Sequence, residues 1–259
     1  MTQHWGDILI TGAAGTIGTI LAPALSEDGH VICLDVVEPS PGSPASRDVR
    51  GDVGDRELLR RCLEPGGAVV HLATGVSRGW EGLLAVDMLG TRNVLDAAAQ
   101  IGVRRVILAS TNHVVGGFEL DYFRRGLVPG PGTDAANILV RPTDPIRPDS
   151  EYGAAKAFGE GYGRFIAETT ETAVTCLRIG TVAPVDNPAA YATSPEFAHI
   201  PGGAEGAGRR LRATWLYHAD LLRIVREELF ASDHFRLRFA VSDNPGRFWS
   251  LDTYRWNPQ

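Results

Sequence analysis

Short apolar runs alternate with longer segments of helical period from Asp7 onward. The 3.6-residue period predicts helices at Thr16 to Ser26, Asp55 to Leu63, Trp80 to Ala99 and Glu151 to Thr170. The apolar runs predict strands at Ile8 to Thr11, Val31 to Val36, Ala68 to Leu72, Val106 to Ser110 and Val174 to Ile179, with a further short strand before Gly51. Strands that alternate with helices are typical of βαβ units with right-handed crossovers. The pattern therefore predicts an α/β fold with a doubly wound parallel sheet.

Three segments rich in Gly, Pro and Ala interrupt this order, at residues 39–46, 116–148 and 183–208. Loops beyond about 15 residues are uncommon in compact domains and are usually functional. The second and third follow strands, so we expect them to form walls of a substrate site. A helix at Trp215 to Phe230 and a strand at Phe235 to Val241 come after them. Residues 181–259 are predicted to form a small C-terminal substrate lobe, which is not an independent domain.

A glycine-rich turn, Thr11 to Gly18, connects the first predicted strand to the first predicted helix. Gly12 makes the tight turn, Gly15 lets the backbone approach a pyrophosphate, and Gly18 lets the helix pack closely on the strand. The helix N-terminus, at Thr16 and Ile17, then faces the phosphates. The alternative is a glycine turn without a ligand.

Asp35 ends the second predicted strand, 17 residues after Gly18, where a carboxylate accepts hydrogen bonds from the adenosine ribose. Such a carboxylate repels a 2′-phosphate, and Val36 and Val37 offer no positive charge to receive one. A Rossmann-like domain over residues 1–180 that binds NAD rather than NADP is therefore predicted. Asp52 and Val53 are expected at the adenine edge, although Asp52 also suits an ordinary polar turn.

Tyr152 and Lys156 lie four residues apart at the start of a predicted helix, so they share one face. An ammonium near a phenol favours the phenolate, which suits proton transfer. Lys156 is the only lysine among 25 basic residues. A chain that uses arginine elsewhere indicates that this position needs a compact ammonium, although an accidental surface lysine is the alternative.

A hydroxyl at the end of the fifth predicted strand would complete the catalytic group. Ser110-Thr111-Asn112-His113 lies there, and Thr111 is predicted to bind the reacting oxygen. The alternative is a polar strand end that caps its own backbone. Tyr152, Lys156 and Thr111 are thus the predicted catalytic residues.

Composition excludes several classes of protein. With 44% hydrophobic and 22% charged residues the chain is neither disordered nor fibrous, and its net charge of −6 without a cluster of arginines argues against nucleic acid. The three cysteines form no CxxC pair, so we expect no metal site and a reducing compartment. No basic leader and no apolar run long enough for a membrane span is present, which predicts a cytoplasmic protein without a membrane partner. The sequence leaves open whether copies form a homo-oligomer.

Together these motifs resemble the extended short-chain dehydrogenases, the NAD-dependent epimerase/dehydratase family, through Thr11 to Gly18, Asp35, His71-Leu72-Ala73 and the Tyr152/Lys156 pair. Within that family the chain is most similar to the uronate dehydrogenases. This similarity rests on Ser110 to His113, Arg147 to Gly153, Phe158-Gly159-Glu160, Arg178-Ile179-Gly180, Thr214-Trp215 and His218-Ala219-Asp220.

The resemblance implies NAD-dependent oxidation of a hexuronic acid at C1 to an aldarolactone. It implies that Leu72, Ala73, Thr74, Tyr152, Lys156 and Ile179 contact NAD. It also implies that the sugar is contacted by Gly75, Thr111, Asn112, His113, Tyr152, Thr181 and Arg210. In it Arg210 clamps the uronate carboxylate by a fork of two charge-assisted bonds. The glycine-rich stretch 202–208 is expected to be mobile and to deliver Arg210 over the substrate.

The chain also departs from that pattern. It reads Thr74-Gly75-Val76 where the family has a serine, it has Thr111 in place of the usual serine, and both long loops are expanded. Two alternatives to a sugar-acid dehydrogenase follow. One is a sugar or nucleotide-sugar epimerase or dehydratase, and the other is a regulator that binds NAD without turning it over.

Overall fold

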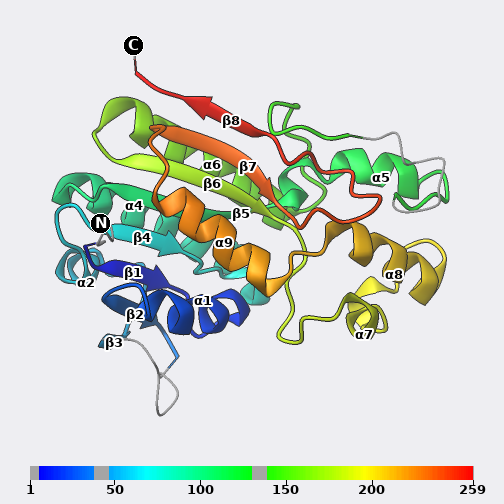
Figure 1. The fold of residues 1–259 in the computed structure, drawn as a ribbon, viewed down its shortest axis with the longest axis horizontal. Helices are drawn as coiled ribbons and strands as arrows, with labels where there is room; N and C mark the ends of the chain where they lie inside the picture. The colour runs from blue at the N-terminus through cyan, green and yellow to red at the C-terminus, as the bar shows by residue number, and fades with distance from the viewer. Residues whose placement is uncertain (1–5, 38–46, 130–138, 259) are drawn as a thin grey trace.

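An eight-stranded sheet runs through the centre of the structure, with helices on both of its faces (Figure 1). The computed structural model describes residues 6–37, 47–129 and 139–258. Within them the strand order is β3-β2-β1-β4-β5-β6-β7-β8, and β8 is antiparallel to its neighbour. The strands are β1 Ile8–Thr11, β2 Val31–Asp35, β3 Arg47–Arg50, β4 Ala68–His71, β5 Arg105–Thr111, β6 Ala173–Ile179, β7 Phe235–Ala240 and β8 Thr253–Trp256. The predicted doubly wound, mostly parallel sheet is confirmed.

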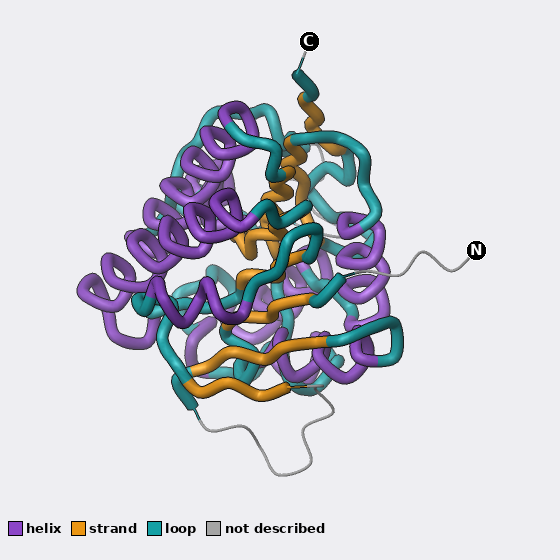
Figure 2. Tube along the Cα trace, turned by 90° about the vertical axis from the view of Figure 1, so that its left-hand side faces the viewer, coloured by secondary structure: helices purple, strands orange, loops and turns teal. Residues whose placement is uncertain are grey.

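Helices cover the sheet in two sets, which Figure 2 shows from the side. The long helices are α1 Thr16–Ser26, α2 Arg56–Cys62, α4 Thr91–Ile101, α6 Glu151–Thr169, α8 Gly203–Thr214 and α9 His218–Leu229. Side chains of α1 and α9 pack on one face of the sheet, and those of α2, α4 and α6 on the other. Ile8 and Ile10 belong to the first core and Leu9 to the second. Both faces are buried, which explains why the strands read as continuous apolar runs.

The order of the strands creates a crevice beside β1. From β1 the chain builds outward to β2 and β3, and then crosses back to place β4 on the other side of β1. Connections from β1 and β4 therefore leave in opposite directions at their carboxyl ends. Open α/β sheets bind ligands at such a switch point.

The prediction of one regular helix from Trp80 to Ala99 is wrong. After a short helical turn, η1 Val76–Arg78, the chain forms α3 Gly79–Gly82, a π-helix η2 Leu83–Gly90, and then α4. The apolar period looks regular across all of these segments, so it does not reveal the wider winding. That winding accompanies the inward placement of Asp87, and π-helical bulges occur frequently at functional sites.

The segments 116–148 and 183–208 were predicted as loops, and the structure corrects this. The first follows directly on η3 Asn112–Val115 and holds α5 Gly117–Phe123, while its residues 130–138 lie outside the described part of the chain. The second holds α7 Pro188–Tyr191, η5 Pro195–Phe197 and the start of α8. Phe197, Ala207, Leu211 and neighbouring side chains are buried in one apolar cluster. This burial outweighs the low helix propensity of a segment rich in Gly and Pro. The predicted loop at 39–46 lies outside the described residues.

The helix predicted from Trp215 begins instead at His218, because Trp215 is extended. Its backbone bridges to Thr181: the Thr181 N–H donates to the Thr214 carbonyl, and the Leu216 N–H donates to the Thr181 carbonyl, both at 2.9 Å. The chain after residue 180 also adds β7 and the unpredicted β8 to the sheet. No helix in the described ranges is long and apolar enough to cross a membrane.

Candidate active site

The glycine turn after β1 closes against the chain that follows β4. Gly12 has a φ of +70°, which favours glycine, and a Cβ there would lie 2.6 Å from the backbone nitrogen of Ala73. A Cβ on Gly18 would lie 2.4 Å from the carbonyl oxygen of Ala13. The tight turn and the close packing of α1 thus both require glycine.

Gly15 faces open space instead. A Cβ on it would meet one atom within 4 Å, the carbonyl oxygen of Gly12 at 3.3 Å. Gly15 is also the N-cap residue of α1, and no side chain caps that helix. The first backbone N–H groups of the helix, at Thr16 and Ile17, therefore have room for an anion in front of them. The turn fits the pyrophosphate of NAD.

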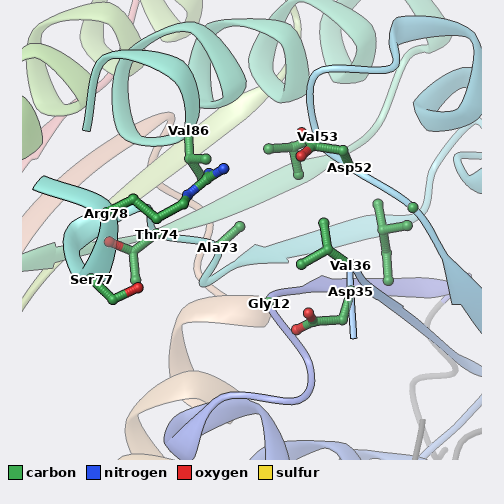
Figure 3. Close-up of a pocket in the computed structure, with 12 residues that line it drawn as sticks. Gly12, Asp35, Val36, Asp52, Val53, Ala73, Thr74, Ser77, Arg78 and Val86 are labelled. Atoms are coloured by element: carbon green, nitrogen blue, oxygen red, sulfur yellow. The ribbon is translucent and has the colours of Figure 1, made fainter. Parts of the chain in front are cut away.

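A cavity of about 260 Å³, here called the cofactor cavity, opens at the ends of β1, β2 and β4 (Figure 3). It is lined by Gly12, Leu34, Asp35, Val36, Gly51, Asp52, Val53, Ala73, Thr74, Ser77, Arg78 and Val86. Six of these residues are predicted cofactor contacts, and they come from the glycine turn and from the ends of β2, β3 and β4. The other predicted contacts are not among the lining residues: Gly15, Thr16, Ile17, Gly18, Leu72, Tyr152, Lys156 and Ile179.

Both acids predicted for the adenosine side border this cavity. The Asp35 carboxylate accepts from the Ala14 N–H at 2.9 Å and from the Val37 N–H at 3.0 Å, which ties the end of β2 to the glycine turn. Asp52 accepts from the Gly54 N–H at 2.7 Å. Asp52 therefore caps its own turn and lines the cavity at once.

Arg78 and Ser77, which were not predicted, also line the cofactor cavity. They belong to η1, and Figure 3 shows Arg78 across the cavity from Asp35. The prediction of NAD over NADP took only the residues directly after Asp35 as possible sources of a positive charge. Arg78 lies 43 residues further along the chain and reaches the cavity only because β4 is next to β1.

A second cavity, of about 510 Å³, lies beyond the ends of β5 and β6 and is here called the β5–β6 cavity. It is lined by Thr111, Asn112, His113, Glu119, Leu120, Phe123, Asp149, Ser150, Tyr152, Gly180, Thr181, Val182, Tyr191, Glu196, Phe197, His199 and Arg210. Six of the seven predicted sugar contacts are among them. Gly75 is not: its N–H donates to the buried Asp87 carboxylate at 2.8 Å.

The two cavities open on the same edge of the sheet. His71, at the end of β4, is opposite Leu108 in the β4–β5 register, and Thr111 is opposite Ile179 in the β5–β6 register. Thr74 in the cofactor cavity and Thr111 in the β5–β6 cavity thus follow neighbouring strand ends. Two ligands bound in these cavities would meet at this edge.

Tyr152 is held at the start of α6. Ser150 caps the helix by accepting from the Gly153 N–H at 3.2 Å. A Cβ on Gly153 would lie 2.4 Å from the carbonyl oxygen of His113, so α6 can approach the end of β5 only with glycine there. The Tyr152 ring then packs edge-on against the His113 imidazole, with 6.2 Å between centroids.

Lys156 lies one helical turn further on and is buried. Its Nζ is 5.7 Å from the Tyr152 ring centroid and 3.0 Å from Oδ1 of Asp87. The side chains of this ion pair are 6% and 0% exposed, so the lysine is not an accidental surface residue. The other Asp87 oxygen accepts from the Gly75 N–H and, at 3.2 Å, from the Thr74 hydroxyl. Asp87 thereby connects Lys156 to the chain after β4.

His71 is buried beside this ion pair. Its Nδ1 is hydrogen-bonded to the Thr11 hydroxyl at 2.6 Å and its Nε2 to the Thr91 hydroxyl at 3.0 Å. Burial, and then the charge of Lys156, lower the pKa of the imidazole from 6.5 to about 3. His71 is therefore neutral at physiological pH and joins β1, β4 and α4.

The two hydroxyls at the end of β5 have different partners. Ser110 donates to Glu160 at 2.6 Å, and Glu160 forms a buried bidentate pair with Arg178. Thr111 lines the β5–β6 cavity, donates to the Asn112 side chain at 3.3 Å and accepts from the His113 N–H at 3.3 Å. Of the two, Thr111 is the hydroxyl available to a ligand, and it also caps the following turn.

His113 is paired with Asp149, which belongs to the motif Arg147 to Gly153 but had no predicted role of its own. The His113 Nδ1 lies 2.8 Å from Oδ2 of Asp149. Burial raises the pKa of the Asp149 carboxyl, but the hydrogen bond and charge of His113 outweigh this, and the net pKa lies below 3.8. Asp149 stands three residues before Tyr152, so its proximity to the predicted catalytic helix was the available signal.

Arg210 lines the β5–β6 cavity from inside α8, not from a mobile loop. Its Nε donates to Oε1 of Glu119 at 2.6 Å and its Nη2 to Oε2 at 2.9 Å. Burial lowers the pKa of the guanidinium, but the charge and hydrogen bonds of Glu119 outweigh this and raise it. Glu119 was missed because it lies in a segment predicted as a loop, where no motif marks it.

None of the described residues form a cluster of three or more His, Cys, Asp or Glu side chains that could hold a metal ion. The chemistry available at the two cavities comes from a phenol, an ammonium, hydroxyls and a dinucleotide cradle. That set is suited to hydride and proton transfer.

Comparison with known proteins agrees with this geometry. The model of the NAD dependent epimerase/dehydratase family matches residues 8–193. The chain is 29% identical over 246 residues to a uronate dehydrogenase of Pseudomonas syringae pv. tomato, which covers 93% of this chain and 76% of that protein. It is 32% identical over 249 residues to an L-arabinose 1-dehydrogenase (NAD(P)(+)) of Haloferax volcanii, which covers 94% and 91%.

A solved structure also superposes over most of the chain. The glucuronic acid dehydrogenase of Chromohalobacter salexigens has a TM-score of 0.73 and 25% identity, and the match covers 95% of this chain and 80% of that one. The glycine turn, Asp35, Tyr152 and Lys156 thus occur in a chain whose relatives include several dehydrogenases. The chain belongs to the NAD dependent epimerase/dehydratase family, and it is an enzyme whose cofactor is NAD.

Proposed function

We propose that this protein is a dehydrogenase that oxidises the C1 hydroxyl of a free sugar or sugar acid to a lactone. The resemblance implies a hexuronic acid, and relatives named uronate dehydrogenase support that class. The relative named L-arabinose 1-dehydrogenase supports a neutral sugar. Oxidation at C1 is common to both classes and is the core of the proposal.

The exposure of Thr111 and Tyr152 to one cavity, with Lys156 buried behind the tyrosine ring, carries this proposal. The Thr111 hydroxyl would bind the sugar C1 oxygen, and the Tyr152 oxygen would accept its proton. NAD, when bound, supplies the acceptor for the hydride that leaves C1 with both electrons of the C–H bond. The C1–O bond then becomes the carbonyl of the lactone.

Lys156 and its neighbours would prepare this step. The ammonium stabilises the negative charge that develops on the Tyr152 oxygen, and burial strengthens this effect. Asp87 fixes the ammonium through the ion pair at 3.0 Å. Asn112 and Thr181 border the same cavity and would bind sugar hydroxyls.

Two observations favour a dehydrogenase over the alternatives. Asn112 and His113 follow Thr111, where a sugar 4,6-dehydratase needs an acidic pair. A regulator that only senses NAD does not need Tyr152 and Lys156, yet both are present in a built site.

The three cysteines are buried and free, which supports the expected cytoplasmic location.

A substrate screen tests the proposal. Purified protein is mixed with NAD and with single aldoses or uronates, and the near-ultraviolet absorbance of NADH is followed. We expect NADH formation with at least one sugar, and none with the matching alditol, which lacks an anomeric C1. Absence of NADH with every sugar at saturating concentrations would contradict the proposed function.

A further inference from the structure

We propose that the β5–β6 cavity selects a neutral aldose over the corresponding sugar acid, because the Glu119 carboxylate is already paired with the Arg210 guanidinium. This inference rests on the proposed oxidation at C1 and specifies its substrate class. The selecting residue is Glu119, which none of the sequence motifs includes.

The Glu119–Arg210 pair has the geometry of a strong interaction. Two hydrogen bonds, at 2.6 and 2.9 Å, join Nε and Nη2 of the guanidinium to both carboxylate oxygens. The two side chains are 8% and 3% exposed. The ion pair as a whole carries no net charge, and the Nε and Nη2 edge of Arg210 already donates to Glu119 and is not available to a second carboxylate.

Helix α5 is anchored so that Glu119 reaches Arg210 across 91 residues of sequence. The Gly117 N–H donates to the Arg147 carbonyl at 2.8 Å. A Cβ on Gly116 would lie 1.9 Å from Oδ2 of Asp149, so only glycine permits this approach. The carboxylate is thus placed by the fold and does not swing freely on a loop.

The rest of the β5–β6 cavity does not compensate for this neutralisation. Among the described residues that line it, Glu119, Asp149 and Glu196 carry carboxylates and Arg210 carries the one guanidinium. His113 is paired with Asp149, and the His199 Nδ1 is hydrogen-bonded to the Glu196 carbonyl at 2.9 Å. A substrate carboxylate would enter a partly buried, acidic site without an unpaired cation, which is costly. Sugar hydroxyls, in contrast, can donate to these carboxylates.

Sugars that differ only in the substituent on C5 test this selection. L-arabinose, D-galactose and D-galacturonate share the configuration of C2 to C4 and carry hydrogen, CH₂OH and carboxylate at C5. We expect kcat/KM of the wild-type enzyme with NAD to be at least about tenfold higher for the better of the two neutral sugars than for galacturonate. The series D-xylose, D-glucose and D-glucuronate repeats the comparison in the other configuration.

Glu119→Gln removes the competing charge and leaves the shape of the side chain. We expect KM for the uronate to fall by about tenfold, because Arg210 then has a charge to offer, while KM for the neutral sugar changes much less. Glu205→Gln is the matched control, since Glu205 pairs with Arg209 on the exposed side of α8, the helix that carries Arg210. It should leave both values unchanged.

The outcomes separate the two proposals. A wild-type enzyme that prefers the uronate in both series would overturn the selection by Glu119 but leave C1 oxidation standing, as would an unchanged preference in a folded Glu119→Gln variant. If that variant fails to fold, the wild-type ratio alone decides. No oxidation of any sugar in either series would overturn the proposed function, and this inference with it.

Discussion

Tyr152 and Lys156 share a face of α6 but lie in different surroundings. Tyr152 borders an open cavity, whereas Lys156 is buried against Asp87. The four-residue spacing and the use of a single lysine predicted this pair from sequence. Asp87 could not be predicted in the same way, because a buried aspartate in an apolar helical run has no local signature and is recognised only by its partner.

Tyr152→Phe tests the assignment of the proton acceptor. We expect kcat to fall by about 100-fold or more, because the proton of the C1 hydroxyl loses its acceptor, while NAD binding persists. Turnover is measured through NADH formation, and NAD affinity by calorimetry. Tyr162→Phe, on the same helix, is the control, since that hydroxyl donates to Asp96 and not into the cavity. A variant at Tyr152 with normal turnover would show that another group takes the proton.

Asp35→Ala tests cofactor choice. The carboxylate lies at the end of β2 and is fixed by the backbone N–H groups of Ala14 and Val37, so it cannot turn away from a 2′-phosphate. We expect the wild-type enzyme to bind NAD at least about tenfold more tightly than NADP, and the variant to reduce this ratio. Dissociation constants for both cofactors measure it. Equal affinities in the wild-type enzyme would mean that Arg78, across the cavity, neutralises the effect of Asp35.

At the scale of elements, periodicity was informative wherever a segment packs on the sheet. The strands β1, β2, β4, β5 and β6 were predicted because two buried faces require continuous apolar residues. Helices α5, α7 and α8 were not, because they pack mainly on each other and on loops, and Phe239 of β7 is the one strand residue in their two apolar clusters. Glu119 and Tyr191, which α5 and α7 bring to the β5–β6 cavity, were missed for the same reason.

His71 connects three elements and gives the fold a pH dependence. The unfolded chain has an ordinary imidazole pKa of 6.5, whereas the folded value is about 3. Between these values the unfolded state binds a proton that the folded state does not. Stability should therefore decrease as the pH falls from 6.5 toward 3, by up to about 1.4 kcal/mol per pH unit from this group.

Denaturant unfolding at several pH values, for the wild-type protein and His71→Gln, measures this contribution. The variant is expected to be less stable at neutral pH, since the Thr11 and Thr91 hydroxyls lose well-placed partners. Its stability should nevertheless depend less steeply on pH below 6.5. Identical slopes in the two proteins would show that His71 does not remain neutral in the fold.

For the whole molecule, the sheet determines which cavities meet. The order β1, β4, β5, β6 places a dinucleotide cradle beside a second cavity, and the segments after β5 and β6 wall that cavity with α5 and α8. The sequence predicted the sheet, the cradle and most residues of the second cavity. It could not predict the charge balance of that cavity, because Glu119 and Arg210 meet only when these helices pack together.

Transfer of deuterium from C1 tests the central claim most directly. A sugar that is oxidised in the screen is prepared with deuterium at C1 and incubated with the enzyme and NAD, and the reduced cofactor is analysed by mass spectrometry. Hydride transfer from C1 predicts one deuterium in each molecule of reduced cofactor, together with an equal amount of lactone or its hydrolysed acid. Reduced cofactor without deuterium, or a sugar product changed at another carbon while its C1 deuterium remains, would contradict it.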